Sequence, residues 1–377
     1  MRKQVVAVVI GTRPEAIKLG PVIAGLTGSG WAEAFVVTTG QHGRVVDDML
    51  ALYGTAPACR LPLDRRGEDL AQLASALVAR LGDTFVRAAP DLVVVQGDTT
   101  SALAGALVGH LLQVPVAHVE AGLRSYEPLP FPEEINRRLI GPLADLHLAP
   151  TPAARDNLRS ERVAGARIVV TGNTVIDALA HVAGLAGGTP GERPLVLVTA
   201  HRRESWGEPM HRIARVVRHL GALYPTVDFF VATHMNPAVR SVFETEISGL
   251  DNVVCAGPLG YREFVEKLIH CELVITDSGG VQEEAASLAL PALVMREQTE
   301  RMEGLMAGLA HLVGTDEELI VKTAAGFLDH AGPPRRRTAR ACAYGDGKAA
   351  ERTVRACGWL LGLDERPSDF SFSHPLG

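Results

Sequence analysis

The sequence lacks the features that would place it among membrane-spanning, nucleic-acid-binding or disulfide-stabilised proteins. No apolar stretch approaches the ~20 residues that a membrane span needs. The formal net charge is −6, whereas nucleic-acid binders usually carry a basic surface. The five cysteines are scattered, without CxxC spacing, which argues against disulfides and structural metals. The apolar run near the N-terminus is too short for an export signal, so we predict a cytoplasmic protein.

Short β-branched apolar runs are abundant instead, and each is followed by a turn residue and an amphipathic stretch. VVAVVI precedes Gly11, and DLVVVQ precedes Gly97. Continuous apolar strands that alternate with helices are typical of parallel sheets covered on both faces. A Gly- and Pro-rich stretch, 183–194, separates two such series in this chain of 377 residues. We therefore predict an α/β fold of two Rossmann-like, doubly wound domains, residues 1–180 and 181–362, that face each other across a cleft.

The C-terminal end has two alternative placements. The helical stretch near 347–362, or the tail 363–377, could return to the first domain. The alternative is a loose tail, because chain ends are often poorly ordered.

Charged side chains follow several predicted strands of the first domain, where doubly wound folds bind their ligands. Arg13 and Lys18 follow the first strand, near a helix N-terminus that favours anions. Asp98 and Glu120 follow two further strands, and Glu133 lies in the helical segment FPEEINRR. Any one of these acids could be a helix cap or a surface group. Several at one sheet edge indicate an acid–base site.

The second domain contains a candidate phosphate-binding turn. Ser278, Gly279 and Gly280 follow the strand ELVIT and open a helix, so their backbone N–H groups could hold a phosphate. Glu284 in that helix could accept ribose hydroxyls, and Arg301 beyond the next strand could meet a phosphate. A tight turn with a helix cap is the alternative interpretation.

Three histidines, His42, His201 and His234, follow predicted strands. A three-histidine metal site is conceivable, but no ligand spacing supports it. No nicotinamide-binding fingerprint is present either. We therefore predict a protein that uses neither a metal nor a cofactor.

Eight segments, in order, resemble the non-hydrolysing UDP-N-acetylglucosamine 2-epimerases. They span about residue 5 to residue 350 and are GTRPEAIKLGP, QGDTTSALA, HVEAGLRS, FPEEINRRL, TGNTVIDAL, TAHRRESWG, DSGGVQEEA and LVMREQTER. The resemblance implies two Rossmann-like domains similar to those of the GT-B glycosyltransferases, and a homodimer.

The same resemblance implies roles for the matched residues. Arg13 and Lys18 match basic residues of the family's active site. Its catalytic carboxylates correspond to Asp98, Glu120 and Glu133, and its active-site histidine corresponds to His201. The residues that match those holding UDP are Ser278, Gly279, Gly280, Glu284 and Arg301.

The activity implied is reversible C2 epimerisation of UDP-N-acetylglucosamine to UDP-N-acetylmannosamine, through elimination and re-addition of UDP and a 2-acetamidoglucal intermediate. Elimination suits this substrate because no carbonyl adjoins C2 to acidify its proton. Three other enzymes stay open: a hydrolysing epimerase, a GT-B glycosyltransferase, and an epimerase for a different UDP-amino sugar in natural-product biosynthesis. A paralogue that only binds nucleotide sugar is a fourth alternative, against which the intact carboxylate set argues.

Regulation is the last expectation from the resemblance. In many bacterial relatives a second UDP-N-acetylglucosamine molecule beside the active site activates the enzyme. The residues that resemble this second site include Gln41, His42, Arg203 and His234. Gly43 stands where relatives have a basic residue, and Gly67-Glu68 stand where Arg-Gln is common. A weakened second site is therefore predicted, unless Arg44, Arg65 or Arg66 compensates.

Overall fold

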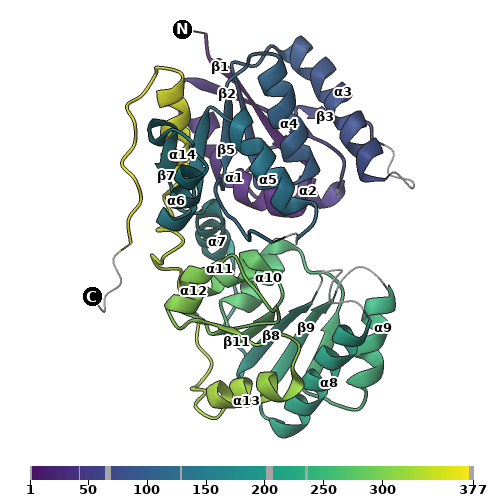
Figure 1. The fold of residues 1–377 in the computed structure, drawn as a ribbon. Helices are drawn as coiled ribbons and strands as arrows, with labels where there is room; N and C mark the ends of the chain where they lie inside the picture. The colour runs from purple at the N-terminus through teal and green to yellow at the C-terminus, as the bar shows by residue number, and fades with distance from the viewer. Residues whose placement is uncertain are drawn as a thin grey trace. The chain divides into compact units, whose positions relative to one another are not determined.

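A computed structural model describes residues 2–41, 43–63, 69–127, 130–200, 207–233 and 237–372, with only the backbone for 237–239 (Figure 1). The chain divides into two compact units. Unit 1 comprises Met1–Ala178 and Ala343–Gly377, and unit 2 comprises Leu179–Cys342. Each unit contains one parallel sheet. This confirms the predicted α/β fold class with two doubly wound domains.

The sheet of unit 1 has the strand order β3-β2-β1-β4-β5-β6-β7. The strands are β1 (Gln4–Ile10), β2 (Ala32–Thr38), β3 (Cys59–Arg60), β4 (Leu92–Gln96), β5 (Val116–Val119), β6 (Leu146–Ala149) and β7 (Ile168–Val170). The first six follow the Rossmann order, in which the direction of winding reverses between β1 and β4. This switch point is where such sheets bind ligands.

Helices cover both faces of this sheet. They are α1 (Arg13–Gly28), α2 (Arg44–Ala51), α3 (Leu70–Ala88), α4 (Thr100–Leu111), α5 (Glu133–Leu143), α6 (Pro152–Ser160) and α14 (Ala349–Leu360), with a short 3₁₀ helix, η1 (Gly165–Arg167). On one face α3, α4 and α5 pack in a row, and α1 packs with α2 and α14 (Figure 1). Strand β1 is buried on both faces, which explains its uninterrupted apolar run.

Unit 2 repeats this winding with the strand order β10-β9-β8-β11-β12-β13. Its strands are β8 (Leu195–Ala200), β9 (Asp228–Thr233), β10 (Val253–Ala256), β11 (Cys271–Thr276), β12 (Ala292–Val294) and β13 (Ala310–Leu312). Its helices are α8 (Glu208–Leu223), α9 (Pro237–Glu246), α10 (Tyr261–Leu268), α11 (Gly279–Ser287), α12 (Met302–Met306) and α13 (Glu317–Leu328). Helix α7 (Thr174–Leu185) runs from unit 1 into unit 2. The switch point of unit 2 lies between β8 and β11.

The chain returns to unit 1 after residue 342. The predicted range 181–362 groups α14 with the second domain, whereas the structure places it in unit 1, in agreement with the expectation that the stretch 347–362 could return to the first domain. Asp177 at the start of α7 explains this attachment, because its carboxylate accepts the N–H groups of Ala349 and Ala350 at 3.2 and 2.8 Å. The tail then follows β7, and the Phe370 N–H donates to the Val170 carbonyl at 2.7 Å.

Candidate active site

The switch point of unit 1 brings several of the predicted residues to one sheet edge. Arg13 is the first residue of α1, directly beyond β1. Asp98 follows β4, and Glu120 follows the neighbouring β5. Since the strands are parallel, their carboxyl ends meet at this edge.

Lys18 and Glu120 form a buried ion pair at this edge. The side chains are 8% and 7% exposed, and Lys18 Nζ donates to Glu120 Oε2. The same oxygen accepts Gln96 Nε2 at 2.9 Å and Asn173 Nδ2 at 3.4 Å. Donors from α1, from β4 and from the segment after β7 therefore converge on one carboxylate. Sequence reasoning missed Gln96, which ends β4, and Asn173, which lies three residues beyond the end of β7.

Glu120 also has an unusual backbone. Its φ of 64° lies in the left-handed region, which costs most residues other than glycine free energy. Such conformations persist where surrounding structure enforces them, and they cluster at functional sites. Here the bonds from Lys18 and Gln96 hold the side chain of this residue in place.

Asp98 is held by helix α5. Arg137 donates from Nε and Nη2 to Asp98 Oδ2 at 2.9 and 2.5 Å. Asn136 Nδ2 donates to the Asp98 backbone carbonyl at 2.8 Å. Both α5 residues are buried, so the carboxylate has a fixed orientation.

A buried histidine supports the same turn from inside the sheet. His118 on β5 is fully surrounded, and its Nε2 lies 2.7 Å from the Gly97 carbonyl. A carbonyl only accepts, so this nitrogen carries the proton. Burial lowers the pKa of His118 to about 3 and keeps the ring neutral.

Of the adjacent glutamates in α5, Glu134 is the more buried. Glu134 is 2% exposed and accepts the N–H groups of Ser125 and Tyr126 at 3.0 and 3.3 Å, as well as Arg137 Nη1 at 3.3 Å. Glu133, the predicted catalytic carboxylate, is half-buried at the first position of α5. Its catalytic role stays a prediction.

Four of the predicted residues, His201, His42, Arg203 and His234, lie outside the described residues. The segment with Gly67 and Glu68 does too. Gln41, predicted for the regulatory site, is buried at the β1 edge. Its Oε1 lies 2.8 Å from where a Cβ on Gly11 would stand. Gly11 is therefore required for this close approach.

The turn after β11 in unit 2 is built around an arginine. Ser278 is the N-cap residue of α11, and its N–H donates to Thr276 Oγ1 at 3.0 Å. A Cβ on Gly279 would lie 3.0 Å from the guanidinium carbon of Arg301, whereas one on Gly280 would meet nothing within 4 Å. Gly279 therefore admits Arg301, and Gly280 leaves the backbone open to a ligand.

Arg301 lies between buried carboxylates. It donates from Nε to Glu283 Oε1 at 3.1 Å and from Nη1 to Glu300. Glu284, the predicted ribose ligand, is also buried and accepts the Tyr261 hydroxyl at 2.6 Å. Unit 2 thus presents a helix N-terminus beside an arginine and a carboxylate that hydrogen bonds fix in place. Such an arrangement suits a nucleoside diphosphate.

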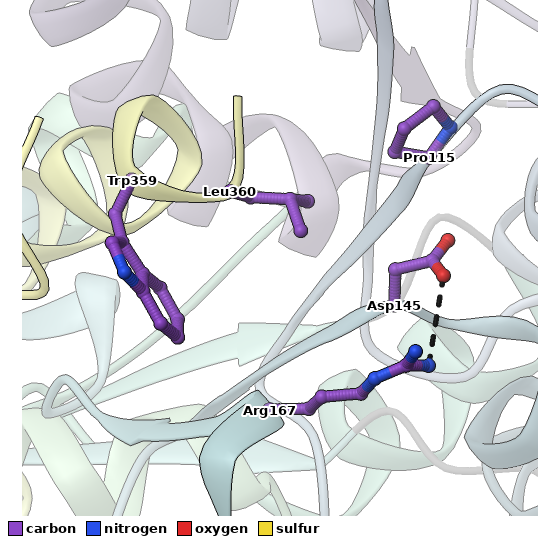
Figure 2. Close-up of a pocket in the computed structure, with 5 residues that line it drawn as sticks. All are labelled: Pro115, Asp145, Arg167, Trp359 and Leu360. Carbon is purple, nitrogen blue, oxygen red and sulfur yellow. Dashed lines mark ion pairs between the residues drawn. The ribbon is translucent and has the colours of Figure 1, made fainter. Parts of the chain in front are cut away.

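A hollow in unit 1 lies away from the carboxyl edge of its sheet. A hollow of about 320 Å³ is lined by Pro115, Asp145, Arg167, Trp359 and Leu360 (Figure 2). It lies at the amino ends of β5–β7, because its first three residues directly precede these strands. Within the described ranges no group of three or more His, Cys, Asp or Glu could hold a metal, and no helix is long and apolar enough to span a membrane.

A sequence model of the UDP-N-acetylglucosamine 2-epimerase family matches residues 25–358. The chain belongs to this family. A UDP-N-acetylglucosamine 2-epimerase of Bacillus subtilis (strain 168) is 39% identical over 378 residues, which cover 98% of this chain and 100% of the relative. The predicted resemblance to UDP-N-acetylglucosamine 2-epimerases is confirmed.

Solved structures of the family have the same fold. The S. aureus MnaA–UDP co-structure has a TM-score of 0.90 and 36% identity, covering 98% of this chain and 100% of that one. UDP-GlcNAc 2-epimerase from Neisseria meningitidis, bound to UDP-GlcNAc, has a TM-score of 0.88 and 34% identity, covering 95% of this chain and 100% of that one. Both match along nearly the full length of this family member.

Proposed function

We propose that the chain epimerises UDP-N-acetylglucosamine and UDP-N-acetylmannosamine reversibly at C2, without hydrolysis. The Glu120 carboxylate carries the proposal. It is buried beside a lysine, held in a left-handed backbone conformation, and located at a ligand-binding edge in a member of an epimerase family.

The proposed reaction is an elimination followed by re-addition. The C1–O bond to the diphosphate breaks, a carboxylate takes the C2 proton, and a C1=C2 double bond forms. UDP then returns to C1 while a proton reaches the opposite face of C2. Asp98, Glu120 and Glu133 are the candidate acids and bases, and their negative charge stabilises the cationic ring of the transition state.

The groups that hold UDP are proposed to lie in unit 2. Ser278, Gly279 and Gly280 offer the N-terminus of α11 to the diphosphate, and Arg301 adds a cation. Glu284, held by Tyr261, accepts ribose hydroxyls. Arg13 and Lys18 in unit 1 are the proposed basic groups near the reacting sugar, and His201 is proposed as an active-site histidine.

Incubation in deuterated water should place deuterium at C2 of the recovered sugar nucleotides. Proton removal at C2 leaves the proton free to exchange with solvent, and its return carries the label. Proton NMR should show the C2–H signal decaying while UDP-N-acetylmannosamine appears. A chelator should leave the rate unchanged.

Other outcomes of this time course identify the alternatives. Epimerised product that retains all its C2 protons would contradict elimination. Stoichiometric UDP with free N-acetylmannosamine would identify a hydrolysing epimerase. UDP release only after an acceptor is added would identify a glycosyltransferase, and epimerisation confined to another UDP-amino sugar would change the substrate.

We also propose a homodimer joined through α3, α4 and α5. These adjacent helices and the residues just before α5 present large apolar side chains to solvent: Val86, Leu111, Phe131, Ile135 and Leu139 are between 47% and 67% exposed. Ile135 and Leu139 lie four residues apart on one face of α5. An exposed apolar surface shared by several helices indicates a protein interface.

Leu111→Arg should convert the dimer to a monomer, because a charge would be buried at the interface. Sedimentation velocity measures this directly, and Met306→Arg in unit 2 is the matched control, since Met306 is 84% exposed on another helix. A native chain that sediments as a monomer at tens of micromolar would refute the dimer.

A further inference from the structure

The turn after β1 contains a buried carboxylate with no part in the proposed reaction. Glu15, in the first turn of α1, is 1% exposed. Its Oε2 accepts the N–H groups of Gly11 and Thr12 at 3.0 and 2.6 Å, and the Thr12 hydroxyl at 2.8 Å. A glutamate at this position commonly caps its own helix in this way. Capping accounts for the bond from the Thr12 N–H, and all three bonds stay within one turn.

The second carboxylate oxygen has a different partner. Glu15 Oε1 accepts the hydroxyl of Thr99 at 2.7 Å, across 84 residues of sequence. Thr99 directly follows Asp98 and is the N-cap residue of α4, where its hydroxyl oxygen accepts the Ala102 N–H at 3.0 Å. Capping of α1 does not require this bond. It links the two turns that flank the switch point of unit 1.

These two turns are also in tight contact. A Cβ on Gly11 would lie 2.3 Å from Ser101 Oγ, and Ser101 Oγ in turn lies 2.8 Å from Thr39 Oγ1. Close-packed interiors transmit displacements because they contain few voids. A shift of the β4–α4 turn therefore shifts the β1–α1 turn as well.

The groups that donate these four hydrogen bonds to the Glu15 carboxylate are uncharged backbone N–H groups and hydroxyls. Burial raises its pKa to about 7, although hydrogen bonds from Thr99, Thr12 and Gly11 lower it. The charged groups on the adjoining elements are Arg13 and Lys18 on α1, Asp98 beside Thr99, and Glu120 beyond β5. None of them donates one of the four bonds to Glu15 given above.

We propose that Glu15 is a positioning residue whose buried carboxylate ties the turn bearing Arg13 to the turn bearing Asp98. Because α1 also carries Lys18, the same tie aligns the lysine that pairs with Glu120. This inference rests on the proposed function for its catalytic consequence, whereas the tie between the turns is independent of it.

Glu15→Gln should lower kcat by about 10²-fold, since displacement of reacting groups by roughly 1 Å costs this much. The amide keeps the size of the side chain but offers one acceptor oxygen instead of two. Thr99→Val should act similarly, whereas Thr99→Ser keeps the hydroxyl and should restore turnover. The Kd of UDP, measured by calorimetry, should change less than threefold (roughly), because the proposed UDP groups lie on unit 2. Asp316→Ala, which removes the N-cap of α13, is the capping control and should keep native kcat.

The pH profile separates positioning from mere capping. The kcat of the native chain should fall as the pH drops below about 7, where Glu15 takes up a proton. Glu15→Gln should lack this acid limb. A variant with the same limb as the native chain, or with kcat at pH 8 close to the native value, would overturn the proposal.

A double-mutant cycle of unfolding free energies tests the Glu15–Thr99 link between the two turns without any enzymatic assay. Urea unfolding of Glu15→Gln, Thr99→Val and the double variant should give non-additive losses, because both side chains make one bond. Relative to Glu15→Gln, the native chain should lose stability as the pH rises from 4.5 to about 7, since the folded chain keeps a proton that the unfolded chain releases. Additive losses would refute the tie. An inactive native chain with non-additive losses would refute the proposed function but not the tie.

Discussion

Replacement of Glu120 by glutamine should lower turnover by about 10²–10⁴-fold, the usual loss when a positioned acid or base is removed. Glutamine keeps the shape of the side chain but can neither take the C2 proton nor stabilise a cationic ring. The affinity for UDP should stay near native, because the proposed UDP groups lie in unit 2. Initial rates from UDP-N-acetylglucosamine and calorimetric titration with UDP measure the two effects separately.

Glu120→Gln also removes the carboxylate that pairs with Lys18, so a control must separate lost catalysis from lost stability. Lys18 is 8% exposed, so a neutral residue at position 120 leaves a buried cation without its carboxylate, which costs about 3–5 kcal/mol. The melting temperature should therefore fall as well. Retained UDP binding at the assay temperature would show that the lost turnover does not come from unfolding.

Glu317→Gln is the matched surface variant. Glu317 pairs with Arg215, but the two side chains are 39% and 40% exposed, and exposed pairs contribute at most about 1 kcal/mol. Its turnover should be native. Near-native turnover of Glu120→Gln under the same conditions would refute the central assignment of the active site.

The fold could be predicted because its signals are local. Two central strands, β1 and β4, contain the uninterrupted apolar runs VVAVVI and LVVV, and a turn glycine follows each strand. Strand ends of a doubly wound sheet meet at one edge, so Asp98 and Glu120 could be grouped before their distances were known. The positions of Asp98 and Glu120 just after predicted strands were sufficient to group them.

The supporting residues could not be predicted, because their partners are distant in sequence. Asn173 donates to Glu120 across 53 residues, and Thr99 donates to Glu15 across 84. Helical periodicity also cannot tell which of the adjacent residues Glu133 and Glu134 is the more buried. The buried position of Glu134 depends on the N–H groups that the turn at Ser125 offers to its carboxylate.

The placement of α14 depended on tertiary structure for the same reason. Its sequence has the apolar spacing of a surface helix, which fits either unit. The Asp177 carboxylate that accepts its first N–H groups is 172 residues away in sequence from Ala349. A contact of that range leaves no local pattern.

Arg301→Met should destabilise unit 2 and weaken UDP binding together. Glu283 and Glu300 have side chains that are 1% and 4% exposed, and Arg301 contacts both. Removal of one partner of a buried ion pair costs about 3–5 kcal/mol, because the remaining charge stays out of water. Urea unfolding should show the loss of stability. Arg240→Met, which breaks an exposed pair with Glu244, should change stability by less than about 1 kcal/mol.

A double variant separates the two roles of Arg301. Arg301→Met combined with Glu283→Gln removes both the cation and one of the carboxylates that it neutralises. Because a buried ion pair contributes little beyond what uncharged residues supply, the double variant should recover most of the stability. UDP affinity should remain at least about tenfold below native, since a charge-assisted bond to phosphate contributes roughly 1.5–3 kcal/mol. Recovery of native UDP affinity along with stability would show that Arg301 holds the fold of unit 2 and does not meet the diphosphate.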